Sequence, residues 1–216
     1  MIREFTFNEV LFILTGVQAT LMLSLLAFVC GTVGGLVIAL SRVSSNQTLK
    51  YVTSAYIELF RGTPLLMQLF LVYFTLALIG FELNAWNAAA ACFTLHASAF
   101  LGEIWRGSIE AVPRGQFEAA RSLSLGYFPR MFRVILPQAI RISLPATIGF
   151  LVQLIKGTSL ASIIGFQELA RTGTIISNGT YRPLLAFGVV AAAYFAICWP
   201  LSLWSSYLER RMSRGR

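Results

Sequence analysis

Long apolar stretches alternate along the chain with short polar segments that are rich in arginine. Five of these stretches are nearly free of charge and long enough for a helix of roughly 20 residues, which crosses about 30 Å of hydrocarbon. They cover about residues 10–40, 62–81, 83–102, 142–166 and 183–208. The pattern predicts an all-α integral membrane protein whose five transmembrane helices form a single domain over residues 1–216.

Composition supports a lipid environment. Of the 216 residues, 56% are hydrophobic and 12% are charged, whereas about 25% of a typical soluble domain is charged. A soluble domain of this size could not bury so much apolar surface, so the lipid bilayer is the expected solvent. The formal charge is +8 and the chain contains no aspartate. Because the arginines lie between apolar stretches, this charge does not indicate nucleic-acid binding.

Lysine and arginine are concentrated in three segments, which follow the first, the third and the fifth apolar stretch. The first of these segments carries Arg42, Lys50 and Arg61. The second carries six arginines between residues 106 and 141, and the third is the C-terminal tail. The positive-inside bias therefore predicts that the N-terminus lies outside and the C-terminus in the cytoplasm. An odd number of spans fits this orientation.

The first apolar stretch contains Gly31, Gly34 and Gly35. Small residues at such spacing let two helix backbones approach closely inside a membrane. We expect these glycines to face a neighbouring helix.

The longest polar segment covers residues 108–137 and is expected to be a cytoplasmic loop. Pro113 and Gly115 interrupt the helix that leaves the third stretch. Residues 116–125 follow with good helix formers and apolar side chains at helical spacing, and Gly126 ends this pattern. The segment predicts a short helix at the membrane interface that is suited to docking into a groove of another protein.

The same loop resembles a known family signature. Glu118, Ala119 and Ala120 are followed at a fixed distance by Leu136 and Pro137. This arrangement is similar to the loop of bacterial ABC importer permeases with the type I transmembrane domain. In that family the loop forms a coupling helix that contacts the ATPase subunit.

The resemblance implies roles for individual loop residues. ATPase coupling is assigned to Gly115, Glu118, Ala119, Ala120, Ser124, Gly126 and Pro137. Ser124 stands where the family usually has a glycine. We expect Gly126 nearby to supply the backbone freedom of that glycine.

Three further motifs resemble the polar amino acid permeases of the histidine and glutamine type. They are residues 60–65, residues 103–107 running into 111–116, and residues 156–160. The resemblance covers about residues 15–208. It implies a permease subunit that moves a polar amino acid across the bacterial inner membrane by alternating access.

The family also implies partners on separate chains. These are a dimer of cytoplasmic ATP-binding subunits, a second permease that is identical or homologous, and an extracytoplasmic amino acid-binding protein. The outer loops are too short to form a substrate-capturing domain. ATP and magnesium would belong to the ATPase, and this chain would carry no cofactor and no metal.

The chain lacks the features of a nucleotide-hydrolysing subunit. A phosphate-binding loop places a lysine directly after a glycine. The only lysines are Lys50 and Lys156, and neither follows a glycine. We therefore expect a transport subunit and not an enzyme.

Lys156 interrupts the fourth apolar stretch, where an ammonium group is costly and usually faces a cavity or a partner. One interpretation is contact with the substrate carboxylate. Another is an ion pair with Glu103 or Glu168. The alternative is that the side chain extends to the membrane surface.

Other polar residues in or near the spans are candidates for the substrate pathway, namely Gln68, Glu103, Gln153, Thr158 and Ser159. Each has a structural alternative. Hydroxyl groups in membrane helices often bond to their own backbone, and amides often bond between helices. Glu103 and Arg106 have the spacing of a local ion pair. The single histidine, His96, is expected to be a packing residue.

Two other classes of protein are weighed against the importer. An ion-coupled transporter or channel usually needs carboxylates within the membrane, and these are scarce here. A membrane enzyme needs a catalytic group of side chains, and the predicted spans contain neither paired carboxylates nor a histidine cluster. The importer hypothesis explains more of the sequence than either.

Overall fold

The computed structural model of the protein describes residues 4–44 and 46–213, and every regular element among them is helical. The elements in chain order are α1 (Phe7–Val43), α2 (Gln47–Gly62), α3 (Leu65–Phe70), the short π-helix η1 (Leu71–Thr75), α4 (Leu76–Leu78), α5 (Ala85–Glu110), α6 (Arg114–Ser122), α7 (Tyr127–Arg130), the short π-helix η2 (Met131–Ile135), α8 (Leu136–Gly157), the 3₁₀ helix η3 (Thr158–Ile164), α9 (Leu169–Thr180) and α10 (Pro183–Ser213). The all-α fold class expected from the sequence is confirmed.

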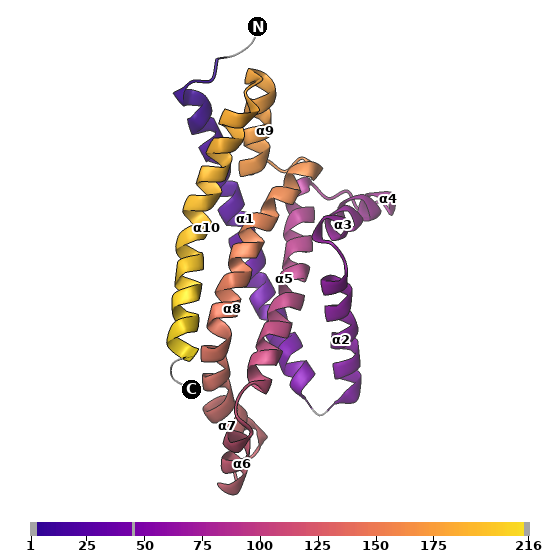
Figure 1. Ribbon diagram of the computed structural model, residues 1–216. Helices are drawn as coiled ribbons and strands as arrows, with labels where there is room; N and C mark the ends of the chain where they lie inside the picture. Colours follow the sequence, from indigo (N-terminus) through magenta and orange to yellow (C-terminus); the bar gives the residue numbers. More distant parts are fainter. Residues whose placement is uncertain (1–3, 45, 214–216) are drawn as a thin grey trace.

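The long helices α1, α5, α8 and α10 form an elongated bundle (Figure 1). The start of α1 and α9 lie at one end of the bundle, whereas α6, α7 and the last turns of α10 lie at the other. The short helices α3 and α4 project sideways from the bundle. We refer to the two ends as the α9 end and the α6 end.

The surface of the bundle is apolar. Many large hydrophobic side chains are exposed along the helices, among them Leu25 on α1, which is 62% exposed, and Leu184 on α10, which is 90% exposed. The buried core instead contains many small residues, and its central aromatic side chain is Phe93 of α5. This distribution is typical of helices that have lipid on one side and close helix packing on the other.

The glycines of α1 pack against α5, as expected from the sequence. A Cβ atom added at Gly31 would lie 2.5 Å from the Cβ of Ala97, and one added at Gly35 would lie 2.9 Å from the Cβ of Leu101. Only glycine permits this approach of the two backbones. The prediction of a close helix contact at these positions is confirmed.

The predicted second span differs in shape from a straight helix over 62–81. Helix α2 ends at Gly62, and the helical segment from Leu65 to Leu78 is bent away from α2 by 105°. The bend lies at Thr63 and Pro64. Proline disfavours a helical conformation in the residue before it, and it lacks the N–H that would continue the helix.

Three helical stretches are long and apolar enough to cross a membrane, and the bent pair of α2 with α3–α4 would be a fourth. The predicted span over 83–102 lies within α5, which has 26 residues and is about 39 Å long. Helix α5 is not among these three stretches, and α1, α2 and α8 pack against it. The count of five spans remains a prediction.

The fourth long helix begins earlier than the predicted span over 142–166. A continuous helical stretch runs from Tyr127 to Ile164, so the second half of the loop expected over 108–137 is helical. Pro137 lies inside this continuous helix, directly after the π-helical segment η2. Proline lacks the N–H of a regular helical turn, and the altered hydrogen-bond pattern of the π-helical segment accommodates it.

Candidate functional site

Helix α6 extends from the end of the bundle and is held on one face only. Ala120 is 2% exposed, whereas Glu118 and Ala119 are exposed. Val112, just before the helix, is buried together with Met131 of η2. The packed face fixes the position of α6, and the other face is free to contact another protein.

The turn after α6 depends on Ser124. This residue adopts the left-handed conformation with φ of 56°, and the Leu125 N–H donates to the Ala120 carbonyl over 3.1 Å. Gly126 instead has φ of −61° and precedes the first turn of α7. The expectation that Gly126 supplies the left-handed residue is therefore wrong. Ser124 adopts the conformation itself, at a cost of about 1 kcal/mol relative to glycine.

The end of the bundle around α6 exposes large apolar side chains. Leu123 is 74% exposed and Phe128 is 70% exposed. Their neighbours on α6 include the charged Arg121 and Glu118, so this surface is not a lipid-facing one. Exposed apolar groups rimmed by polar residues mark sites of protein contact.

Lys156 lies in the last turn of α8 with its side chain exposed. Gln153, three residues earlier, is also exposed and therefore lies on the same helix face. Among the described residues Lys156 forms no ion pair with Glu103 or Glu168. The carboxylate of Glu103 instead pairs with Arg61 and Arg106. The Lys156 ammonium group therefore stays exposed on the same face of α8 as Gln153.

The hydroxyl groups beside Lys156 bond to their own helix. Thr158 is fully buried and donates to the Ile155 carbonyl over 2.7 Å. Ser159 donates to the Lys156 carbonyl over 2.8 Å. A hydroxyl group that bonds to its own helix is less available to bind substrate.

Gln68 holds the bend between α2 and α3. Its Nε2 donates to the carbonyls of Phe60 and Thr63 over 2.7 and 3.0 Å. Its Oε1 lies 3.0 Å from Nδ1 of His96, which therefore carries the proton. The His96 ring packs on Phe100 with ring centroids 4.4 Å apart. Gln68 thus satisfies backbone carbonyls that the bend leaves free, and His96 bonds to the Gln68 side chain and packs on Phe100, so Gln68 bonds between elements and His96 is a packing residue.

Glu103 joins α5 to α2. Arg106 donates to both carboxylate oxygens of Glu103, over 2.7 and 2.8 Å. Nη1 of Arg61 lies 3.4 Å from the same carboxylate. The local pair of Glu103 with Arg106, expected as an alternative to substrate contact, is confirmed as a contact.

Residues 31–214 match the family described as the inner membrane component of binding-protein-dependent transport systems. The chain belongs to this family. It is an ABC permease, as the loop signature around Glu118 predicts, and therefore a membrane transport component.

Two curated relatives from Bacillus subtilis (strain 168) align with nearly the whole permease. The probable amino-acid ABC transporter permease protein YckA is 37% identical over 214 residues, which is 96% of this chain and 95% of that protein. The L-cystine transport system permease protein TcyB is 38% identical over 200 residues, which is 92% of this chain and 86% of that protein. The predicted resemblance to the amino acid uptake subfamily is confirmed.

A solved structure supports the same fold. The permease matches a chain from a crystal structure of an amino acid ABC transporter with histidines, with a TM-score of 0.87 and 40% identity. The match covers 93% of this chain and 94% of that chain. The type I permease architecture predicted from the sequence is confirmed by this agreement.

One buried carboxylate in the permease has a role that the sequence did not indicate. Glu168 is fully buried, and it accepts hydrogen bonds from the backbone N–H groups of Ala170 and Arg171 over 2.9 and 2.8 Å. The Tyr194 hydroxyl of α10 donates to it over 2.8 Å. The side chain of Thr20 on α1 lies 3.4 Å away. Glu168 therefore joins α1, α9 and α10.

The sequence feature that indicates this role lies next to Glu168 itself. An acidic residue at the start of a helix interacts favourably with the helix dipole and with unpaired N–H groups. Gly165, with φ of 89°, ends η3 three residues before Glu168. A turn followed by an acid could have been interpreted as a helix start. The partner on α10 could not have been found in this way.

Proposed function

We propose that this permease moves a polar amino acid across the bacterial inner membrane, driven by ATP hydrolysis on a separate pair of ATPase subunits. The names of its relatives specify amino acids or cystine. The substrate of this chain is inferred from them. The mechanism is alternating access, with no bond chemistry on this chain.

The observation that carries the proposal is the position of α6. The helix lies at the end of the bundle, with Ala120 packed and Glu118 exposed. A helix held in this way transmits force between the bundle and whatever grips its free face. We propose that each ATPase subunit binds this face, with Leu123 and Phe128 filling apolar pockets at the edge of the contact.

We also propose that the α6 end faces the cytoplasm. Five exposed arginines lie at this end, namely Arg114, Arg121, Arg133, Arg210 and Arg211. The α9 end carries Arg171 and Arg182. The positive-inside bias favours this orientation, with the N-terminus outside, where an extracytoplasmic binding protein would deliver the amino acid.

The substrate pathway is proposed to run along the face of α8 that carries Gln153 and Lys156. This polar face is exposed on a single chain and would be covered by a second permease, identical or homologous. Lys156 would bind the carboxylate that every amino acid carries. The walls of the pathway would be held in place by Thr158, Ser159, Gln68 and Glu103.

The test of the proposal is the variant Glu118→Arg in the assembled transporter, reconstituted in proteoliposomes with its ATPase and its binding protein. We expect amino acid uptake to fall at least tenfold, because a charge reversal at the contact costs an amount comparable to a lost charged hydrogen bond. The amount of inserted permease should stay the same. Uptake and ATP hydrolysis would be measured together.

The matched control is Glu209→Arg, which makes the same charge change at an exposed position near the α6 end but on α10. This variant should keep normal uptake. Normal uptake by Glu118→Arg would contradict the assignment of α6 as the coupling helix.

A further inference from the structure

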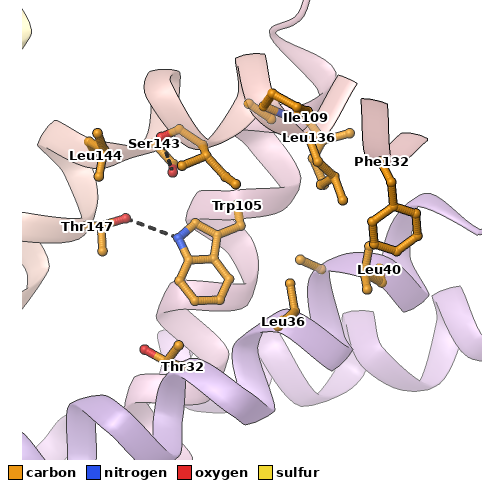
Figure 2. A pocket seen from close by; sticks show the side chains of 14 residues that line it. Thr32, Leu36, Leu40, Trp105, Ile109, Phe132, Leu136, Ser143, Leu144 and Thr147 are labelled. Carbon is orange, nitrogen blue, oxygen red and sulfur yellow. Dashed lines mark hydrogen bonds between the residues drawn. The ribbon is translucent and has the colours of Figure 1, made fainter. Parts of the chain in front are cut away.

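A groove of about 500 Å³ lies between α1, α5 and the stretch from η2 into α8. Figure 2 shows Leu36 and Leu40 of α1 on one wall, facing Trp105 and the residues of α8. It lies toward the α6 end of the bundle, because these parts of α1 and α8 are the ones nearest to α6. Among the described residues its lining includes Pro137, which the family resemblance assigns to ATPase coupling, and none of the residues of the pathway proposed above.

The groove suits an apolar occupant. The indole Nε1 of Trp105 already donates to the hydroxyl of Thr147 over 3.1 Å, and the Ser143 hydroxyl donates to the Ile140 carbonyl over 2.9 Å. These bonds involve Trp105, Thr147 and Ser143, and Thr32 is the one other polar side chain in the described part of the lining (Figure 2). A polar amino acid would lose its hydration here without compensating hydrogen bonds, which is unfavourable.

The groove opens sideways toward the membrane. Leu36, Phe132 and Ile140 line it and are 47%, 57% and 57% exposed. Side chains of this kind at a lateral opening are in contact with lipid when the bundle is in a bilayer. An acyl chain can therefore enter the groove without crossing a polar barrier.

Two exposed arginines stand next to lining residues of the groove in the sequence, and the acid next to the lining residue Ile109, Glu110, is already paired with Arg106. Arg133 follows Phe132 and Arg141 follows Ile140, and both arginines are exposed. No acidic residue occurs between Glu118 and Glu168. The guanidinium group binds phosphate through paired hydrogen bonds, and a basic residue at the membrane surface attracts anionic lipid.

We propose that this groove binds one acyl chain of an anionic phospholipid, whose headgroup phosphate lies against the flanking arginines Arg133 and Arg141. A second copy of the permease is a poorer occupant. With the groove on the two-fold axis of a symmetric pair, the arginines of the two copies would face and repel each other. An anionic lipid satisfies both the apolar lining and the charge.

Trp105 lines the groove, so its indole fluorescence reports contact with whatever occupies the groove. The full-length permease would be reconstituted in vesicles that contain phosphatidylglycerol and phosphatidylcholine, with bromine on the acyl chains of one lipid or of the other. Bromine quenches indole emission at contact. The signal of Trp105 would be isolated in a variant with phenylalanine at Trp86, Trp199 and Trp204. If that variant is unstable, the difference between wild type and Trp105→Phe isolates the same signal.

We expect stronger quenching of Trp105 by brominated phosphatidylglycerol than by brominated phosphatidylcholine at equal bromine content. The preference should correspond to roughly fivefold tighter association for each arginine. The double variant Arg133→Gln with Arg141→Gln should abolish it. The matched double variant Arg210→Gln with Arg211→Gln removes the same charge at the same end of the bundle and should keep it.

Two results would overturn the proposal. Equal quenching by both lipids would mean that only bulk lipid reaches the groove, without a headgroup site. No quenching by either lipid would mean that protein covers the groove, as in a contact with a second permease. A separate variant that keeps Trp204 as its single tryptophan, 55% exposed on α10, is the positive control for quenching by bulk lipid.

Discussion

At the scale of single residues, Ser124 determines the turn that follows α6. A serine in the left-handed conformation is strained, whereas Gly126 two residues later is not in that conformation. Glycine is therefore favoured at position 124 and not at position 126. This difference can be measured as a change in the free energy of unfolding.

We predict that Ser124→Gly stabilises the permease by about 1 kcal/mol, because glycine adopts the left-handed conformation without strain. Gly126→Ser should be neutral or slightly stabilising, since this residue precedes the first turn of α7 and a Cβ there meets no atom within 4 Å. Thermal unfolding in detergent would show both effects. A loss of stability in Gly126→Ser, with no gain in Ser124→Gly, would contradict the assignment of the turn.

Lys156 is the residue on which the proposed pathway depends. We predict that Lys156→Met raises the KM for amino acid uptake about tenfold or more, because a hydrogen bond to a charged carboxylate contributes about 1.5–3 kcal/mol. Lys156→Arg should restore part of the affinity. Transport assays on the reconstituted complex would give KM and the maximal rate separately.

The other lysine supplies the control for this prediction. Lys50→Met removes the same charge from α2, away from the pathway, and should leave KM unchanged. An unchanged KM in Lys156→Met would instead mean that Lys156 only extends toward the membrane surface.

The sequence identified polar residues within the membrane more reliably than it identified their partners. Gln68 was recognised as a polar residue in an apolar stretch, yet its contacts with Thr63 and His96 depend on a bend that hydropathy does not encode. Glu168 was considered only as an ion-pair partner of Lys156, because the side chains that it does contact, Thr20 and Tyr194, are far away in the chain. Such contacts follow from the helix arrangement.

At the scale of helices, the contact between α1 and α5 is the closest part of the bundle. Gly31 and Gly35 lie one turn apart on α1, against Ala97 and Leu101 of α5. The spacing of these glycines predicted this contact because backbone approach requires small residues at that period.

We predict that Gly31→Ala destabilises the permease by about 1–3 kcal/mol, because its Cβ would lie 2.5 Å from that of Ala97 and would overpack the contact. Gly188→Ala in α10 is the control, since a Cβ there meets no atom within 4 Å. Alanine is the better helix former, so the control should be neutral or stabilising. Thermal unfolding of the isolated permease distinguishes the two, and equal effects would contradict the packing account.

Hydropathy located the long helices but not the break in the second span. Helix α2 is polar enough to look like a loop, and the apolar segment after Pro64 looked like a complete span. The structure combines the two as a helix bent by 105°. A window that averages hydropathy cannot distinguish a straight helix from two short ones joined at a proline.

At the scale of the whole molecule, two exposed surfaces remain without a partner within the described chain. One is the free face of α6 with Glu118, and the other is the face of α8 with Lys156. A single bundle would expose the α8 face with Lys156 to lipid, so it cannot enclose a polar pathway by itself. The proposed importer explains both surfaces through an ATPase and a second permease.

The most direct test of this account is native mass spectrometry of the complex purified through this chain from its own membrane. The account predicts two permease chains, identical or homologous, together with two copies of an ATPase that has a phosphate-binding loop. A permease that is recovered alone, and stays alone after mild crosslinking before purification, would contradict it and would favour an ion-coupled transporter.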